Sequence, residues 1–306
     1  MKIQTTKDEI LNKIYFVNRA MSTKISNFIL NGTMLETKGD ILNIYGTDLE
    51  TSIKTSIKVK TELEGRVIAP SKILINVLKS FPESKVEIEL LKETNELKLV
   101  CQKANFKLNT FSLEEYPQFP SINEQNKFRI KASLLKYLVS KVQKSCSSDE
   151  SRIILTGILI DIKNNFINLA ATDSYRLSVA GREIKYGGDT IKAVVPLRVM
   201  ETIAKSDISE SEIDINIEEN QISFTIEEKD GLKTEIVSRL LSGKFPDYEN
   251  LIPKEFAHSI VINKNIMLEV IRRISSISQD NIPVRLDLEK GRINVSMNIK
   301  EVGSSS

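Results

Sequence analysis

The chain of 306 residues has no tryptophan, one histidine and two cysteines, and it has no long apolar run. Two cysteines are too few for a disulfide framework, and Cys101 shares the strand parity of Leu97 and Leu99, so we expect a buried thiol in a reducing cytosol. The strongest apolar stretch, residues 153–160, is far too short to span a bilayer, and the acidic N-terminus lacks the apolar core of a signal peptide. These absences predict a cytoplasmic protein.

Catalytic and cofactor-binding patterns are also scarce. His258 is the only histidine, and no serine or cysteine nucleophile has an obvious histidine partner in the sequence. The chain contains neither the Gly-x-x-x-x-Gly-Lys-Ser/Thr phosphate loop nor Gly-x-Gly-x-x-Gly, which argues against nucleotide hydrolysis and dinucleotide binding. Cys101, Cys146 and His258 are too few and too scattered for a zinc site. We therefore predict no catalytic residue, no metal and no cofactor.

Adjacent acidic residues leave one enzymatic alternative open, a metal-dependent nuclease. Glu114-Glu115 and Glu218-Glu219 could supply carboxylates to Mg²⁺. Neighbouring residues of a strand point to opposite faces, so solvated edges are the simpler interpretation of both pairs. Mg²⁺-dependent cleavage of plasmid DNA would reveal such an activity.

Three short segments recur at a spacing close to one domain. They are Thr47-Asp48 and Thr172-Asp173, Pro70 and Pro196, and Tyr116-Pro117-Gln118-Phe119 and Phe245-Pro246-Asp247-Tyr248, at offsets of 125 to 129 residues. The opening at Ile3 recurs at Ile130 and Ile262, so a third repeat begins, but residues 257–306 are too few to complete it. We predict three domains, copy 1 (1–124), copy 2 (125–256) and copy 3 (257–306), the last without its C-terminal half.

Each complete copy has the pattern helix, strands, helix, strands. Helical periodicity marks residues 7–19, 131–146 and 264–277, and further helices follow Pro70 and Pro196, with each proline expected at the first helical position. Clean alternation predicts antiparallel strands with one packed face at residues 85–90, 96–100, 106–111, 212–217, 221–226 and 234–237. We predict an α+β fold in which two helices lie on antiparallel sheets in each copy.

The net charge is only +2, so any contact with nucleic acid must come from where the charges sit. Lys72 and Lys79 share one helix face, and Arg198 and Lys205 repeat this pair at an offset of 126 residues. Further basic residues lie opposite the apolar stripes of their helices, namely Lys136, Lys141, Lys144, Arg272 and Arg273. A solvated face explains any one helix, but the habit shared by four helices favours a surface for duplex nucleic acid, held by phosphate contacts without base readout.

Longer segments of copies 2 and 3 carry a family resemblance. They are Ala171-Thr172-Asp173-Ser174-Tyr175-Arg176-Leu177-Ser178-Val179, Arg239-Leu240-Leu241-Ser242-Gly243-Lys244-Phe245-Pro246-Asp247-Tyr248 and Pro283-Val284-Arg285-Leu286. Together with the repeat and the basic helices, they resemble the bacterial sliding clamps, the beta subunit of DNA polymerase III, and the resemblance runs through the whole chain. It implies three similar domains per subunit and a head-to-tail dimer that closes a ring around duplex DNA, with helices inside and sheets outside.

The resemblance implies a topological function without catalysis, in which the ring slides on DNA and tethers the replicative polymerase to raise its processivity. The implied partners are double-stranded DNA bound without sequence specificity, the DNA polymerase III catalytic subunit, the clamp loader ATPase complex, and other polymerases and repair proteins. A separate ATP-driven loader agrees with the lack of a phosphate loop in this sequence. The homodimer is implied for chains with a complete third domain, so dimerisation of this chain stays open.

Family clamps bind their partners in a cleft near the junction of the second and third domains. The matching residues are Arg152, Thr172, Ser174, Tyr175, Arg176, Leu177, Pro246 and Leu251. Ser174 replaces a glycine that relatives often carry, with an open effect on the cleft. Thr172-Asp173 also has a simpler interpretation as a turn between strands, because Thr47-Asp48 fills the same repeat position without a following Tyr-Arg-Leu. Apolar anchors with a polar rim suit an extended peptide.

The resemblance and the charge pattern also assign a DNA surface and a dimer contact. The DNA-facing candidates are Lys24, Lys72, Lys79, Lys136, Lys141, Lys144, Arg198, Lys205, Arg272 and Arg273. Phe106 matches a family interface position, and Ile274 and Ile277 are its expected opposite side. Ordinary core packing is the alternative for all three apolar residues.

Family members carry a complete third domain, and its final residues form one wall of the cleft, whereas this sequence stops before that part. We prefer a clamp subunit with a truncated third domain. The alternative is a fragment that forms no ring and acts as a peptide-binding or DNA-binding module. A solution mass near twice the chain mass of 34.6 kDa would favour the ring.

Overall fold

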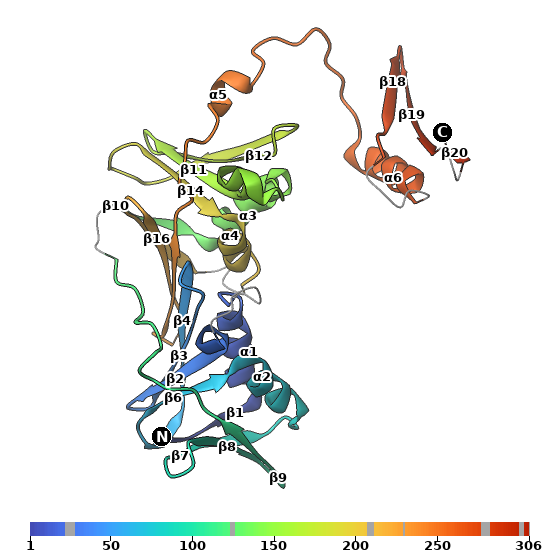
Figure 1. Ribbon diagram of the computed structural model, residues 1–306. Coiled ribbons are helices and arrows are strands. Elements are labelled where there is room, and N and C mark those ends of the chain that lie inside the picture. Colours follow the sequence, from blue (N-terminus) through green and yellow to red (C-terminus); the bar gives the residue numbers. More distant parts are fainter. Residues whose placement is uncertain are drawn as a thin grey trace. The chain divides into compact units, whose positions relative to one another are not determined.

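A computed structural model describes residues 1–21, 28–122, 126–206, 211–228, 230–276, 282–299 and 303–305 (Figure 1). The chain falls into two compact units, Met1–Tyr248 and Glu249–Ser306, which we call the N-terminal unit and the C-terminal unit. The N-terminal unit holds copy 1 and copy 2 as far as Tyr248. The domain boundaries after residues 124 and 256 stay predictions.

Copy 1 follows the predicted order of helix, strands, helix, strands. Its elements are β1 (Lys2–Thr6), α1 (Lys7–Asn18), the 3₁₀ helix η1 (Phe28–Asn31), β2 (Gly32–Lys38), β3 (Ile41–Thr47), β4 (Thr51–Lys58), β5 (Lys60–Leu63), β6 (Arg66–Pro70), α2 (Ser71–Ser80), β7 (Lys85–Leu91), β8 (Glu96–Cys101) and β9 (Ala104–Asn109). Strands β7 and β8 begin at the residues where the alternation predicts them.

Copy 2 repeats this order. Its elements are β10 (Asn126–Lys131), α3 (Ala132–Val142), η2 (Gln143–Ser145), η3 (Glu150–Thr156), β11 (Gly157–Lys163), β12 (Phe166–Thr172), β13 (Leu177–Glu183), β14 (Ile191–Pro196), α4 (Leu197–Ala204), β15 (Glu212–Ile217), β16 (Gln221–Glu227) and β17 (Lys233–Arg239). All strand pairs described in both copies are antiparallel, so the predicted α+β fold is confirmed.

One sheet runs through both copies. Its strand order is β10-β15-β16-β17-β4-β3-β2-β6, so β17 of copy 2 pairs directly with β4 of copy 1. The copy 1 sheet β5-β1-β7-β8-β9 and the copy 2 sheet β13-β12-β11-β14 complete the N-terminal unit. Side chains reinforce the β4–β17 junction, because Lys54 pairs with Glu235 at 2.7 Å and the hydroxyls of Thr55 and Thr234 lie 2.7 Å apart.

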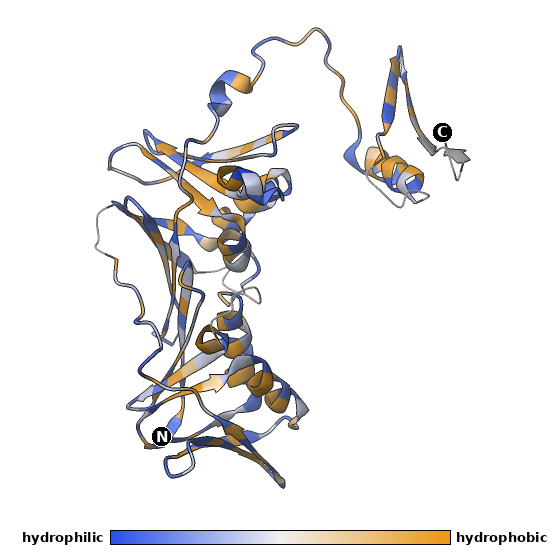
Figure 2. Ribbon diagram, in the orientation of Figure 1, coloured by the Kyte–Doolittle hydropathy of each residue, from blue (hydrophilic) through white to orange (hydrophobic). Residues whose placement is uncertain are grey.

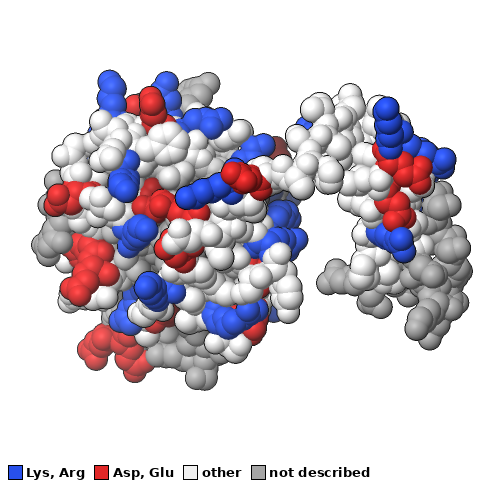
Figure 3. Space-filling view, turned by 90° about the horizontal axis from the view of Figure 1, so that it is seen from above, with Lys and Arg blue, Asp and Glu red and all other residues white. Residues whose placement is uncertain are grey.

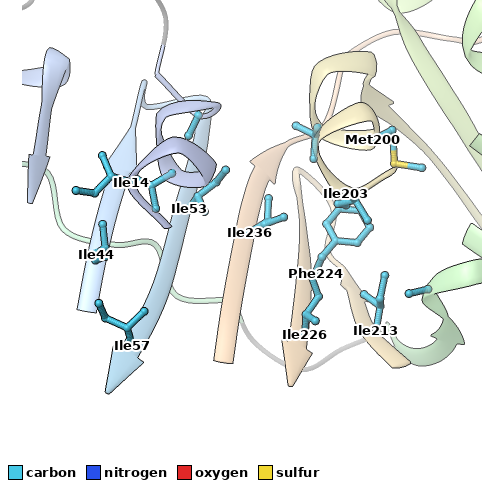
Figure 4. Packing of buried hydrophobic residues seen from close by; sticks show 14 of the residues in the cluster. Ile14, Ile44, Ile53, Ile57, Met200, Ile203, Ile213, Phe224, Ile226 and Ile236 are labelled. Atoms are coloured by element: carbon cyan, nitrogen blue, oxygen red, sulfur yellow. The ribbon is translucent and has the colours of Figure 1, made fainter. Parts of the chain in front are cut away.

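Helices α1, α2, α3 and α4 lie together on one side of the eight-stranded sheet, with the copy 1 sheet containing β7, β8 and β9 below them and the copy 2 sheet containing β11 and β12 above them in this view (Figure 1). Each helix presents an apolar stripe to the strands, as Leu74, Ile75, Val77 and Leu78 do on α2 (Figure 2). The hydrophobic core continues across the β4–β17 junction, from Ile44 and Ile53 to Ile236 and Phe224 (Figure 4). Cys101 is a buried free thiol in this core, as predicted.

The helices after the repeated prolines differ slightly from expectation. Pro70 and Pro196 are the last residues of β6 and β14 and occupy the N-cap positions of α2 and α4, instead of the first helical position. Each proline has an extended ψ, near 110° and 134° respectively, which continues the strand into the helix start. The predicted helix starts are therefore wrong by one residue. Proline is compatible with the end of an edge strand as well as with the start of a helix, so its presence alone does not distinguish the two positions.

The C-terminal unit has a small core of its own. Helix α5 (Tyr248–Leu251) spans the boundary between the two units in sequence, and the elements that follow are α6 (Lys264–Ser275), β18 (Arg285–Glu289), β19 (Arg292–Ile299) and β20 (Gly303–Ser305). Asn263 caps α6 by accepting hydrogen bonds from the amides of Asn265 and Ile266. The α6 side chain of Ile274 packs with Val295 and Met297 of β19.

Candidate partner cleft and basic helix surface

The turn between β12 and β13 is built by the side chains of Thr172 and Asp173. Thr172 Oγ1 donates to the carbonyl of Arg176 at 2.8 Å and accepts from the amide of Ser174 at 3.1 Å. Asp173 Oδ1 accepts from the amides of Tyr175 and Arg176, both at 3.0 Å, and its other oxygen accepts from Arg176 Nε. These amide and guanidinium donors hold the pKa of Asp173 below its usual value. The turn therefore presents Tyr175, 94% exposed, to solvent.

The same turn recurs in copy 1. Asp48 Oδ1 accepts from the amides of Glu50 and Thr51, and Thr47 Oγ1 accepts from the amide of Leu49. Leu49 and Ser174 occupy the same turn position with positive φ of 73° and 78°. This conformation explains why glycine would suit the position of Ser174. Thr-Asp is thus a turn motif in both copies, and the residues after it distinguish copy 2.

Arg152 joins the turn from the preceding 3₁₀ segment. Its backbone in η3 is non-helical, with φ −114° and ψ 63°, and its Nη1 donates to Ser174 Oγ at 2.9 Å. Asp149 accepts from Arg152 Nε at 3.1 Å and fixes the other edge of the guanidinium. The structure therefore brings Arg152 against Ser174, in the turn that also contains Arg176.

An apolar cluster adjoins these polar residues through Ile154 and Leu177. Its buried members are Leu155, Leu159, Ala170, Val194, Phe245 and Tyr248, with Ile154, Leu177 and Leu241 packed against them. Pro246 is half-buried between Phe245 and Tyr248 in sequence. Leu251, 59% exposed, is the last residue of α5 and belongs to the C-terminal unit. Arginine side chains beside apolar residues are the groups that an extended peptide with hydrophobic anchors would need.

Sequence reasoning missed several members of this cluster. Ile154, Leu155, Leu241 and Phe245 contribute to the apolar cluster but were not singled out as cleft residues. Phe245 lies inside a recurring segment, so its repeat position was a usable signal. Ile154 and Leu155 belong to an apolar run whose irregular 3₁₀ backbone follows no strand or helix period, so no pattern marked them.

The predicted basic residues in the described part of the N-terminal unit lie on α2, α3 and α4 or just after them. Lys72, Lys79, Lys141, Lys144 and Lys205 are exposed. The ammonium groups of Lys79 and Lys141 lie 4.9 Å from the ring centres of Tyr15 and Tyr137, and Lys205 pairs with Glu201 at 2.8 Å. Within the described ranges, neither Lys72 nor Lys144 has an acidic partner within 4.0 Å. Arg272 and Arg273 are exposed on α6 of the C-terminal unit, and Lys24 lies outside the described residues.

Two of the predicted DNA-facing residues bond to groups that are distant in the sequence. The guanidinium of Arg198 pairs with Asp48 of copy 1 and also donates to the carbonyl of Ala20 at 3.0 Å. Asp48 is only 6% exposed, so this ion pair closes the junction between the copies. Lys136 donates to the carbonyl of Ser206. Arg198 and Lys136 therefore each make a bond within the protein, whether or not they also contact DNA.

The three predicted dimer residues fall into different environments. Phe106 lies on β9, the edge strand of its sheet, is 40% exposed and packs against Phe81 with ring centres 5.7 Å apart. Ile274 is only 3% exposed and belongs to the core of the C-terminal unit, which is the alternative that sequence left open. Ile277 lies outside the described residues. Of the two that lie in the described part of the chain, Phe106 is the accessible one.

Charges of both signs are interspersed on the end of the N-terminal unit that Figure 3 shows.

Among the described residues, no three histidine, cysteine, aspartate or glutamate side chains are grouped so that they could hold a metal ion. None of the helices in the described ranges has the length and apolarity needed to cross a membrane.

Comparisons with known families match both copies separately. The model of the DNA polymerase III beta subunit N-terminal domain matches residues 1–120, and that of its central domain matches residues 129–247. Together these two domains of one protein account for most of the chain.

Individual relatives extend the similarity. The beta sliding clamps of Streptomyces coelicolor and Bacillus subtilis are 27% and 29% identical, over 100% and 99% of this chain and 80% and 82% of their own length. The crystal structure of the Bacillus subtilis clamp superposes with a TM-score of 0.90, covering 100% of this chain and 82% of that one. A Pseudomonas aeruginosa clamp bound to griselimycin has the same fold, with a TM-score of 0.90 at 21% identity. The chain therefore belongs to the DNA polymerase III beta subunit family, the bacterial sliding clamps, which are non-catalytic processivity factors.

Proposed function

We propose that this chain is a processivity clamp that holds duplex DNA against its helix surface and tethers a polymerase to it. The observation that carries the proposal is the placement of α1, α2, α3 and α4 on one side of a continuous sheet, with exposed lysines on or just after α2, α3 and α4 (Figure 1). Lys72 and Lys144 have charges free for a phosphate group among the described residues. A nearly neutral protein can thereby concentrate positive charge where a polyanion passes.

The binding we propose is weak and depends on salt. Each lysine that neutralises one phosphate contributes about −0.9 to the slope of log affinity against log salt concentration. A few such contacts permit sliding, because none of them recognises a base. The retention of such a clamp on DNA then depends on closure around the duplex, with the affinity of each contact kept low.

We further propose that the cleft of copy 2 receives an extended peptide from a polymerase, a clamp loader or a repair protein. Leu155, Leu177 and Phe245 would contact apolar anchors of the peptide, and Arg152 and Arg176 would contact its polar groups. Griselimycin, which is bound in the Pseudomonas aeruginosa structure, is a ready probe for testing whether this chain shares the binding property.

The function is tested by retention on circular DNA. The purified chain is loaded by a bacterial clamp loader onto nicked circular plasmid, separated from free protein by gel filtration at raised salt, and then exposed to a restriction enzyme. A ring-forming clamp stays with circular DNA and is released on linearisation. Retention that survives linearisation would refute encirclement, and light scattering would show whether the chain is a dimer of twice 34.6 kDa.

The second candidate is a module that binds peptide or DNA without forming a ring. The observation that favours it is the N-terminal unit, which holds both the lysine surface and most of the cleft in one compact body. A monomeric mass with peptide binding intact would select this alternative.

A further inference from the structure

Copies 1 and 2 each pair a carboxylate with a basic residue at the same strand positions; the carboxylate side chains are 12% and 4% exposed, and their basic partners are 61% and 59% exposed. Glu36 is the fifth residue of β2 and lies opposite Arg66, and Asp161 is the fifth residue of β11 and lies opposite Lys192. Arg66 Nε donates to Glu36, and Lys192 Nζ lies 3.4 Å from Asp161 Oδ2. Asp161 is 3% exposed, so it is a carboxylate that needs hydrogen-bond donors.

Each carboxylate also accepts a hydrogen bond from a tyrosine, but the tyrosines come from different elements. In copy 1, Tyr45 Oη of the neighbouring strand β3 donates to Glu36 Oε2 at 2.8 Å. In copy 2, the same position of β12 is Ala170, and Tyr248 Oη donates to Asp161 Oδ2 at 3.0 Å. Tyr248 comes from the segment after β17, 87 residues away from Asp161 along the chain.

The two copies therefore hold their recurring segments differently. In copy 1, Phe119 corresponds to Tyr248 and has no hydroxyl; it is half-buried and contacts the ring of Tyr45 with centres 6.0 Å apart. Tyr116 fixes that segment by donating to the carbonyl of Tyr45 at 3.3 Å. In copy 2 the segment itself supplies the donor, and Tyr248 is 3% exposed.

The segment that Tyr248 fixes carries cleft residues. Phe245 and Tyr248 belong to the apolar cluster, and Pro246 lies between them in sequence. Leu241, at the start of the same segment, packs on this cluster, and its amide donates to the carbonyl of Val194 at 2.8 Å. Tyr248 thus attaches the distal end of this segment to β11, the strand that also supplies Leu159 to the apolar cluster.

From this juxtaposition we infer that the Tyr248–Asp161 hydrogen bond is a fastener that positions residues 241–248 for peptide binding. The replacement of Tyr45 by Ala170 at the repeat position leaves the carboxylate available to Tyr248. The inference rests on the proposed peptide-binding function. It names Tyr248 and Asp161 as positioning residues, which act through Phe245 and Pro246.

The test compares two matched variants of the full chain. Tyr248→Phe removes the fastening hydroxyl and keeps the ring, whereas Tyr45→Phe removes the corresponding hydroxyl–carboxylate bond of copy 1, remote from the cleft segment. Hydrogen exchange measures protection of amides 241–248, and fluorescence anisotropy measures the affinity for a labelled peptide with leucine and phenylalanine anchors. We expect Tyr248→Phe to raise exchange in this segment and weaken peptide binding about threefold to tenfold, the range for one buried hydrogen bond.

The control variants separate positioning from general stability. Tyr45→Phe should lower the thermal midpoint comparably while leaving the exchange of residues 241–248 and the peptide affinity unchanged. Asp161→Asn keeps a carbonyl oxygen that can accept from Tyr248, and so it should retain most of the peptide affinity. Equal loss of affinity in Tyr248→Phe and Tyr45→Phe would overturn the inference, because it would show a global effect.

The exchange measurement also separates this inference from the proposed function. If the unmodified chain binds no peptide, the proposed cleft function fails, and exchange in Tyr248→Phe still decides whether the fastener exists. If the unmodified chain binds peptide and Tyr248→Phe binds it equally well with unchanged exchange, the inference is wrong and the cleft function stands.

Discussion

Arg198 and Lys72 occupy similar places in the repeat, yet they should respond to substitution in opposite ways. Arg198→Met leaves Asp48, 6% exposed, without its guanidinium partner, although the amides of Glu50 and Thr51 still bind its other oxygen. Removing one partner of a fully buried ion pair costs roughly 3–5 kcal/mol. The Arg198 side chain is 43% exposed, so solvent screens the pair and we expect a loss of about 2 kcal/mol.

Lys72→Met provides the contrast. Lys72 is exposed and has no acidic partner within 4.0 Å in the described part of the chain, so its removal should change the free energy of unfolding by less than about 0.5 kcal/mol. If Lys72 contacts a phosphate, its loss makes the log–log salt slope of DNA binding shallower by about 0.9.

The assay pairs urea unfolding, followed by circular dichroism, with DNA affinity measured across a salt series. The expected outcome is a lower urea midpoint for Arg198→Met and a shallower salt slope for Lys72→Met. An Arg198→Met variant that unfolds like the unmodified chain but loses as much salt slope as Lys72→Met would refute the reasoning. It would show that Arg198 serves the DNA surface and that its pair with Asp48 contributes little.

Three further predictions concern the core, the cleft turn and the thiols. Phe224→Ala, at a fully buried ring in the shared core, should cost about 3–5 kcal/mol and lower the urea midpoint steeply, whereas a cost below about 1 kcal/mol would contradict its burial. Because the pKa of Asp173 is lowered by the amides of Arg176 and Tyr175, its contribution to stability is complete above its usual value of 3.8 and is lost as pH falls below it; Asp173→Asn should flatten this acid limb in a pH series of thermal midpoints. Burial raises the pKa of the Cys146 thiol to about 12 from 9.0, so its contribution is present below pH 9 and is lost as pH rises toward 12, and Ellman's reagent at pH 8 should modify Cys146 quickly only in urea.

Local pattern was enough to predict most elements of both copies. The alternation at residues 212–217 predicted β15 with the bounds that the structure gives, because one face of that strand is buried at Ile213 and Ile215. Strand β5 was missed because its four residues bury no side chain and so show no alternating pattern. The apolar stripe of α6 predicted a packed face, but a stripe does not reveal what it packs against, so a dimer contact and core packing both stayed open for Ile274, which packs in the core of the C-terminal unit.

Long-range pairings were beyond the reach of local pattern. Arg198 and Asp48 are 150 residues apart in sequence, and their bond depends on the junction between the two copies. Likewise, the repeat identified Tyr248 as the counterpart of Phe119 but could not show that its hydroxyl replaces that of Tyr45. Repeats predict which positions correspond. A hydrogen-bond donor that comes from a different element in each copy is visible only in the three-dimensional structure.

The β4–β17 junction has a mechanical consequence for the molecule. Backbone pairing at Ile53–Ile236 and at the adjacent positions joins the copies, so a hinge between them would have to break a ladder in the middle of a sheet along with the core behind it. The N-terminal unit should therefore move as one rigid body. Its more flexible parts should be the edge strands, such as β9 and β13, where each sheet ends with an unpaired row of backbone groups in the described structure. If this chain opens to admit DNA, we expect the bending and the parting to occur at those edge strands, with the centre of the unit unchanged.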